Sequence, residues 1–391
     1  MKGFPMEEDG IVVFSGTIQP TIAMINVTGA CPNETWCHGT PANVTMDHAH
    51  QPLHVVFKIF QAMITILIII FALLGNILVV YAFCNYHRLR ANVTNYYIVS
   101  LAFSDILTAG LVVPFELDQT IRDGIWTHGR ITCQLWTTLY LLVVPGSIIN
   151  LCAVTLDRFI VLHMPLRYTT IITPRKAIVA IVCLWTYALV TACLPVLGWK
   201  DQNYDYILFN ACYFPLLQEY VMLINITNFL LPMIFMAVFW SLIFKIAKKH
   251  QRRVKKLERS MSMVETTMSL SINGNEAQNG RPSMSEGGKK KTIRKHLKGS
   301  KYIAIIVGTF FICWLPYTLL SLGVSICGTK CFRGTPREVH NILLLMGYLN
   351  SALNPYMYSF HDRQFKEAFK NILFNIQSHK VWDLLRRGNN E

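Results

Sequence analysis

Seven long apolar segments dominate the hydropathy pattern of the chain. They cover about residues 55–84, 93–117, 133–162, 176–199, 217–247, 300–326 and 339–360. Each is long enough for a helix that crosses a bilayer, which needs roughly 20 mostly apolar residues. Several contain prolines or polar residues, which membrane helices tolerate where neighbouring helices or a wet cavity satisfy the freed polar groups. The pattern predicts an all-α membrane protein, a seven-transmembrane helix bundle with a polar interior.

Composition agrees with this fold class. Of the 391 residues, 52% are hydrophobic and only 15% are charged. That balance is too apolar for an ordinary soluble domain of this length.

The positive charge predicts the orientation of the bundle. Residues 245–301 hold 16 Lys and Arg against four Glu, a net charge of +12 out of +14 for the whole chain. Basic loops face the cytoplasm, so the loop over 248–299 is expected inside and the N-terminus outside. The tail 1–54 agrees, since Asn26, Asn33 and Asn43 each begin a glycosylation sequon. Residues 55–376 then form the membrane domain and 377–391 a cytoplasmic tail.

The 11 cysteines divide by this topology. Six lie at outer helix ends or in outer segments, where an oxidising compartment allows three disulfides: Cys133 and Cys212, the close pair Cys31 and Cys37, and the close pair Cys327 and Cys331. The other five lie in or at the ends of helices and are expected to be apolar filling: Cys84, Cys152, Cys183, Cys193 and Cys313. Metal binding by cysteine is not expected.

Polar residues within the segments mark the interior of the bundle, because an ionisable group in a membrane helix is costly and faces inward. Asp105 lies near the middle of the second segment. One face of the third segment carries Tyr140, Val144, Ser147, Leu151 and Arg158, and one face of the seventh carries Gly347, Asn350, Asn354 and Tyr358. An aspartate facing serine and asparagine oxygens suits a sodium ion, and a hydrogen-bonded water network explains the same spacing equally well.

Short motifs along the segments resemble those of one receptor family. They are "GNILVV" with Asn76, "LAFSD" with Asp105, Asp157-Arg158-Phe159, Trp185, Pro232, "CWLPY" (313–317) and "NPYMY" (354–358), in this order. The set spans about residues 55–376 and resembles the rhodopsin-like (class A) G-protein-coupled receptors. This resemblance implies a plasma-membrane receptor, not an enzyme, that answers an extracellular small-molecule ligand by activating a heterotrimeric G protein. Arrestin, receptor kinases and membrane lipid are further expected partners, and nucleic acid is not.

The resemblance also implies roles by position. The activation switch that meets the G protein is Asp157, Arg158, Phe159, Asn354, Pro355 and Tyr358. The sodium pocket is Asp105, Ser147, Asn350 and Asn354, the packing switch is Ile148, Pro232 and Phe310, and the toggle is Trp314. Cys133 and Cys212 match the disulfide between helix three and the second outer loop. Residues 359–374 are expected to form a short amphipathic eighth helix with Phe360, Phe365, Phe369 and Leu373 toward lipid. No cofactor beyond the sodium ion is implied.

The ligand class stays open between amines and adenosine-like purines. Trp136 and Tyr348 resemble residues of amine receptors, but Tyr140 replaces their ammonium-binding aspartate, and a phenol is uncharged at neutral pH. Phe214 resembles the adenine-stacking residue of adenosine receptors, whereas Ser321 replaces their helix-six asparagine. The predicted ligand contacts are Glu116, Trp136, Tyr140, Val144, Phe214, Asn225, Asn228, Tyr317, Ser321 and Tyr348.

Glu116 and Asp118 are candidates for the missing negative charge. Both lie near the outer end of the second segment, and Glu116 lies 11 residues after Asp105, on nearly the same helical face. The alternative is a hydrated carboxylate at the rim of the bundle.

Two other classes of function leave no comparable pattern. A seven-helix transporter or channel would show an inverted repeat or a path of charged groups, and a membrane enzyme would show a nucleophile with its base or metal ligands such as HExxH.

His296 bears on the activity of the receptor without ligand, because many members of the family carry an acid there that restrains the helix-three arginine. Its replacement predicts measurable ligand-independent signalling.

Overall fold

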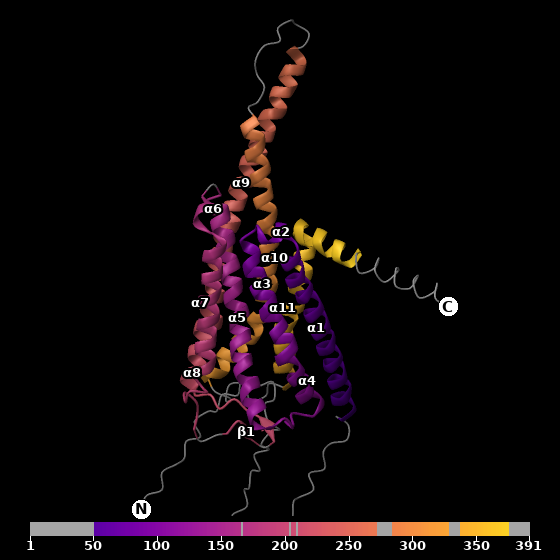
Figure 1. Ribbon diagram of the computed structural model, residues 1–391, viewed down its shortest axis with the longest axis vertical. Helices are drawn as coiled ribbons and strands as arrows, with labels where there is room; N and C mark the ends of the chain where they lie inside the picture. The colour runs from indigo at the N-terminus through magenta and orange to yellow at the C-terminus, as the bar shows by residue number, and fades with distance from the viewer. Residues whose placement is uncertain are drawn as a thin grey trace, which may run out of the picture.

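The computed structural model describes residues 51–165, 167–202, 205–208, 210–271, 284–327 and 337–374. Within these ranges, seven helical rods stand side by side as one bundle (Figure 1). Each rod corresponds to one apolar segment of the sequence, so the predicted fold class is confirmed.

The rods vary in length and regularity. In chain order they are α1 (Gln51–Asn85), the run of α3 (Thr94–Leu107), η1 (Thr108–Val112) and α4 (Val113–Ile121), then α5 (Gly129–His163), α7 (Pro174–Cys193), the run of α8 (Gln218–Ile224), η2 (Asn225–Leu230) and α9 (Leu231–Ser271), then α10 (Met284–Cys327) and α11 (Arg337–His361). The connections hold α2 (His87–Arg90), α6 (Tyr168–Ile171) and an antiparallel pair of short strands, β1 (Ile207–Leu208) and β2 (Ala211–Cys212). Residues 363–374 form a further helix after α11.

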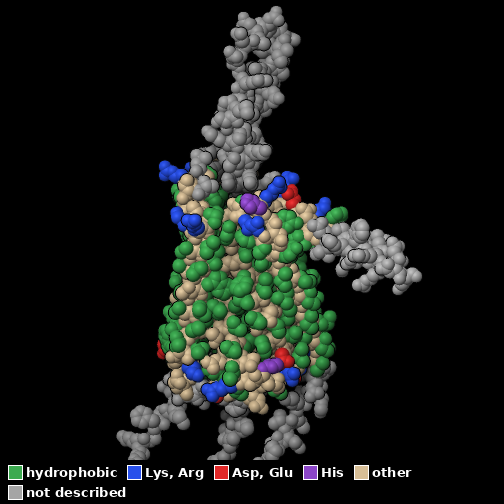
Figure 2. Space-filling model, in the orientation of Figure 1, with side chains coloured by type: hydrophobic (Ala, Val, Ile, Leu, Met, Phe, Trp, Pro, Cys, Tyr) green, Lys and Arg blue, Asp and Glu red, His purple; other side chains and the backbone are tan. Residues whose placement is uncertain are grey.

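The outer surface of the bundle suits a membrane. In the part of the chain that is described, six of the rods are long and apolar enough to cross a bilayer. Figure 2 shows hydrophobic side chains around the middle of the bundle and charged side chains toward its two ends. The helix α11 is more polar, but it packs against α1 and α10, and its Asn350, Ser351 and Asn354 are buried. The chain is therefore a multi-pass membrane protein.

The two ends of the bundle differ in what they carry. We call one end the disulfide end, because Cys133 and Cys212 are bonded there beside β1 and β2. The other is the Arg158 end, where α5 finishes. In Figure 1 the disulfide end lies below, and α9 and α10 extend beyond the bundle above.

The helices that flank the basic loop continue further than the sequence predicts. The stretch 261–288 is low in bulky apolar residues, which predicts an irregular segment, but α9 ends at Ser271 and α10 begins at Met284. The extension of α9 over 261–271 holds three Met, one Glu and one Leu, which favour helix even without apolar packing. The segment 272–283 lies outside the described residues.

Two turns of π-helix interrupt the rods, and each is followed closely by a proline. The turn η1 precedes Pro114, and η2 precedes Pro232. Proline lacks an N–H group and clashes with the preceding turn, and a π-turn absorbs the disturbance while adding one residue to the rod. The extra residue changes the direction in which Glu116 and the residues around Asn225 project.

The eighth helix covers 363–374 and begins four residues later than predicted, because α11 continues to His361. Two of its aromatic residues also point elsewhere than predicted. Phe365 and Phe369 are buried, with Phe365 packed 5.9 Å from the ring of Tyr358 and 5.8 Å from that of Phe369. The prediction that these two face lipid is wrong, because the helix turns at Asp362 and lays this face against the end of α11. Leu373 is exposed as predicted, and the side chain of Phe360 lies outside the description.

Close packing of α1 on α11 gives a first testable prediction. A Cβ atom on Gly75 would lie 2.8 Å from two ring carbons of Pro355, and the proline ring is rigid. Gly75→Ala is therefore expected to cost about 1–3 kcal/mol through overpacking, seen as a lower thermal unfolding midpoint of the purified protein in detergent. Gly308→Ala is the matched control, because no atom lies within 4 Å of its added Cβ. Equal midpoints for the two variants would contradict the contact.

Candidate functional site

At the Arg158 end, a buried carboxylate holds the arginine. Asp157 is 3% exposed, and its Oδ2 lies 3.0 Å from a guanidinium nitrogen of Arg158. Thr94 Oγ1 donates to Asp157 Oδ2 at 2.6 Å, and Tyr168 OH donates to Oδ1 at 2.7 Å. Burial and the neighbouring carboxylate raise the pKa of Tyr168 well above its usual value, so the phenol remains a donor. The predicted switch pair Asp157 and Arg158 is thus fixed from three elements, α3, α5 and α6.

The other predicted switch residues lie around this pair and along α11. The ring of Phe159 stacks on His163 at 5.3 Å and meets Phe239 of α9 edge-on at 5.0 Å. Tyr358 is buried, and Pro355 packs against Gly75.

In the middle of the bundle, polar oxygens surround Asp105. Asn354 Nδ2 donates to Asp105 Oδ2 at 2.9 Å, and Ser104 and Ser147 share a hydrogen bond at 2.8 Å. Three buried acceptors have no hydrogen-bond partner in the described part of the chain: Asp105 Oδ1, Asn350 Oδ1 and Asn354 Oδ1. Acceptors without donors are what a hard cation or ordered water would satisfy. The arrangement fits both interpretations of the sequence.

The predicted packing switch and toggle lie inside the bundle. Ile148 and Phe310 are completely buried, and Pro232 accepts a long contact from Cys152 Sγ at 3.7 Å. The ring of Trp314 lies 6.0 Å from that of Phe229. It also packs closely on Gly347, because a Cβ atom added to that glycine would lie 3.0 Å from two of its ring carbons. Movement of α10 against α11 would therefore have to move Trp314.

Between Trp314 and the disulfide end lies a group that we call the tyrosine–carboxylate cluster: Glu116, Tyr140, Tyr317 and Tyr348. It draws one residue each from α4, α5, α10 and α11, and all four are buried. The hydroxyls of Tyr140 and Tyr317 are 3.3 Å apart. Each of the four groups interacts electrostatically with the other three. The sequence-predicted candidate charge and the tyrosine that replaces the helix-three aspartate are thus brought together.

Aromatic rings cover this cluster on the side of the disulfide. Phe214 is 1% exposed, and its ring lies 5.8 Å from Tyr140 and 5.6 Å from Trp136. Trp136 Nε1 donates to the carbonyl of Val112 at 3.0 Å. Val144, one turn along α5 from Tyr140, is also buried.

A second polar group lies where η2 meets α10. Asn225 Nδ2 donates to Ser325 Oγ at 3.0 Å, and Ser321 Oγ donates to Asn225 Oδ1 at 3.1 Å. Asn228 turns the other way, since its Oδ1 accepts from Tyr187 OH of α7 at 2.8 Å. Asn225 and Asn228 therefore serve different helices.

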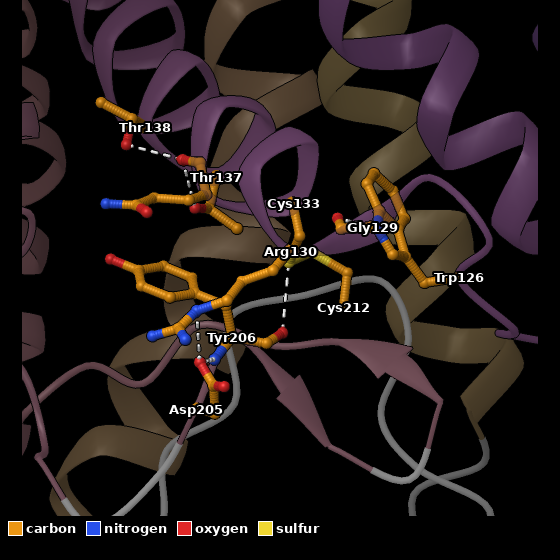
Figure 3. The surroundings of a disulfide bond; sticks show 10 residues. Trp126, Gly129, Arg130, Cys133, Thr137, Thr138, Asp205, Tyr206 and Cys212 are labelled. Carbon is orange, nitrogen blue, oxygen red and sulfur yellow. Dashed lines mark hydrogen bonds and ion pairs between the residues drawn. A yellow bond between two sulfur atoms is a disulfide. The ribbon is translucent and has the colours of Figure 1, made fainter.

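The disulfide between Cys133 and Cys212 fixes the start of α5 to β2, as Figure 3 shows. Around it, Arg130 pairs with Asp205 at 3.0 Å, and Trp126 Nε1 donates to the carbonyl of Gly129 at 2.8 Å. Phe214 follows Cys212 by two residues, so the disulfide positions the ring that covers the cluster.

The remaining cysteine and sequon predictions are tested unevenly. Cys327 is disulfide-bonded, whereas Cys331, Cys31, Cys37, Asn26, Asn33 and Asn43 lie outside the described residues. The five cysteines that were predicted to be apolar filling are free thiols, of which Cys313 is buried, two are partly buried (Cys152 and Cys193) and two are exposed (Cys84 and Cys183).

Comparison with known proteins decides the family. A family model described as 7 transmembrane receptor (rhodopsin family) matches residues 75–358. The chain belongs to this family.

Similar relatives include the Alpha-1A adrenergic receptor of Oryctolagus cuniculus, 32% identical over 83% of this chain and 70% of the relative. The Octopamine receptor beta-1R of Drosophila melanogaster is 31% identical over 88% of this chain and 66% of the relative, and the D(1A) dopamine receptor of Didelphis virginiana is 30% identical over 81% and 74%. The chain is thus a G-protein-coupled receptor and not an enzyme. Its partners are a small-molecule ligand and a G protein.

Several residues of the receptor's site were missed from sequence. Thr94 and Tyr168 hold Asp157, Ser325 holds Asn225, and Tyr187 holds Asn228. A lone hydroxyl on an apolar segment gives no signal of which distant residue it meets. The proline that follows each π-turn was a usable signal for the changed direction of Glu116 and Asn225.

Proposed function

We propose that the receptor binds a small extracellular amine at the tyrosine–carboxylate cluster. The observation that carries this proposal is the burial of a carboxylate, Glu116, among three phenols from three other helices. Aromatic faces attract cations, and a carboxylate supplies the charge that an ammonium group pairs with. The names of the similar receptors, which are adrenergic, octopamine and dopamine receptors, favour an amine over an adenosine-like purine.

We further propose that the disulfide end faces the outside of the cell and the Arg158 end the cytoplasm, in the plasma membrane. Residues 245–301, which include the facing parts of α9 and α10 and the segment between them, carry a net charge of +12, which favours the cytoplasmic side. Residues 1–54 are then a glycosylated outer tail, 55–376 the receptor domain and 377–391 a cytoplasmic tail. Disulfide chemistry supports the same choice, because disulfides persist in oxidising compartments.

Signal transfer then runs from the cluster to Arg158. An amine that draws Tyr317 toward Glu116 would bias α10, and Trp314, packed on Gly347, would link that movement to α11. A sodium ion held by Asp105, Ser147, Asn350 and Asn354 would favour the resting arrangement, because it ties α3, α5 and α11 together. Movement of α10 away from α5 would free Arg158 for a heterotrimeric G protein, in a shift between two populations.

Other partners follow from the surfaces at the Arg158 end. The serines and threonines of the basic loop would serve receptor kinases, and arrestin would read the phosphorylated loop. The helix over 363–374 would lie on lipid through exposed Leu373 and Phe374, with Lys366 and Lys370 near anionic head groups.

Expression of the full chain in cells tests the ligand class. Dopamine and octopamine, with adenosine and a set of peptides as the other arms, are applied while cyclic-nucleotide and calcium responses are recorded. An amine response that is absent from Arg158→Ala is expected. A response to adenosine and to no amine would contradict the proposal.

A further inference from the structure

The tyrosine–carboxylate cluster assigns a particular binding mode for the amine. We propose that the ammonium group of the ligand binds Glu116 of α4 within the rings of Tyr140, Tyr317 and Tyr348, and makes no ion pair with α5. This inference rests on the proposed function, that an amine binds at this cluster, and adds the role of each phenol and the absence of any ion pair between the ligand and α5. The ligand class that fits is a protonated arylalkylamine.

The geometry places Glu116 deep enough for this role. Glu116 is 8% exposed. Asp118, two residues further along α4, lies at the surface and is paired with Arg122 at 2.8 Å and His128 at 3.0 Å. The π-turn η1 just before α4 adds a residue to the rod, which turns Glu116 toward the phenols and Asp118 toward the rim. Attraction between unit charges grows as water is excluded, so the buried carboxylate is the stronger partner for an ammonium group.

The three tyrosines complete the recognition of a cation. Tyr348 is only 2% exposed, and its buried hydroxyl has no hydrogen-bond partner within the described ranges. It can accept from an ammonium N–H. The hydroxyls of Tyr140 and Tyr317 already contact each other, so these two residues offer mainly their ring faces, which attract cations.

The aryl end of the ligand is set by the neighbouring rings. Phe214 and Trp136 lie edge-on to each other and Phe214 edge-on to Tyr140, so they form an aromatic wall beside the cluster. An aryl group stacks on such a wall while the ammonium group reaches α4. The molecule then lies across the bundle, from the β2 segment to α4.

Moving the charge between helices tests this mode. Dopamine is the probe, and 3,4-dihydroxyphenylethanol, in which a hydroxyl replaces the ammonium group, is its uncharged counterpart. Glu116→Gln is expected to raise the dopamine concentration for half-maximal response by about 30-fold or more, and Asp118→Asn is the matched control, expected to leave it unchanged. The double variant Glu116→Gln with Tyr140→Asp is expected to recover much of the loss, since a carboxylate returns on α5.

Each outcome separates this inference from the proposed function. A wild-type receptor that answers neither dopamine nor octopamine refutes the amine proposal itself. A wild-type response to dopamine that Glu116→Gln leaves unchanged at equal surface expression overturns only the binding mode. If Glu116→Gln fails to reach the surface, Tyr348→Phe decides: a loss of about tenfold supports the mode, and no loss overturns it. The uncharged counterpart is expected to be inactive on every variant.

Discussion

Asp157→Asn is expected to raise the ligand-independent signalling of this receptor about tenfold, and Arg158→Ala to abolish it. In the described part of the chain, Arg158 pairs with Asp157 at 3.0 Å, while its Nε lies buried without a hydrogen-bond partner. The position from which many family members add a second acid is His296, whose side chain lies outside the description. A hydrogen bond to a charged group contributes about 1.5–3 kcal/mol, and 1.4 kcal/mol is about tenfold in a population.

Asp157→Asn removes the negative charge and keeps the size of the side chain. Its amide oxygen can accept from one of the two hydroxyls that hold Asp157, Thr94 at 2.6 Å or Tyr168 at 2.7 Å, and its NH2 group can donate to the other, so the local fold is expected to survive. The measurement is basal cyclic-nucleotide or calcium signal at matched surface expression. Glu367→Gln is the control, because it removes an exposed carboxylate paired with Arg363 at 2.7 Å. An Asp157→Asn receptor as quiet as the wild type would show that this pair does not restrain Arg158.

Loss of the disulfide is expected to have the largest effect on stability. Cys133 and Cys212 are 79 residues apart in sequence, and both are completely buried. Closing a loop of that length restricts the unfolded chain by an amount equivalent to about 4 kcal/mol. Cys133→Ser would also release β2 and Phe214, which covers the tyrosine–carboxylate cluster.

Thermal unfolding of the purified protein in detergent, together with surface expression, measures this effect. Cys133→Ser is expected to lower the unfolding midpoint strongly and to weaken ligand binding. Cys193→Ser is the matched control, because Cys193 is a half-buried free thiol at the same end of the bundle. Equal midpoints for the two variants would contradict the structural role of the bond.

The sequence predicts the rods of the bundle because an apolar run of about 20 residues in a membrane protein forms a helix that crosses the bilayer. All seven apolar runs form rods. The run of α11 could be predicted despite its polar residues, because Asn350 and Asn354 share one face and leave the other faces mostly apolar. The helical ends in the basic loop were underestimated, because helix propensity there acts without apolar periodicity. Phe365 was misplaced because an amphipathic pattern does not distinguish lipid from the end of α11.

The site was predicted where a motif fixes a position and missed where two distant segments meet. Asp157, Arg158, Asp105 and Asn354 follow from motifs, and they form two separate pairs, Asp157 with Arg158 and Asn354 with Asp105. Hydrogen bonds across helices, such as Tyr187 to Asn228, depend on how each helix is rotated about its axis. The extra residue of a π-turn changes that rotation. Spacing alone therefore could not place Glu116 beside the three phenols.

Nucleotide exchange on a purified G protein tests the central claim most directly. The full-length receptor is reconstituted into lipid vesicles with heterotrimeric G proteins of several classes, and binding of a non-hydrolysable GTP analogue is followed with dopamine, octopamine, 3,4-dihydroxyphenylethanol or no ligand. We expect slow exchange without ligand, faster exchange with an amine, no acceleration by the uncharged compound, and none in Arg158→Ala. Equal acceleration by dopamine and its uncharged counterpart, or exchange that persists in Arg158→Ala, would contradict the central claim.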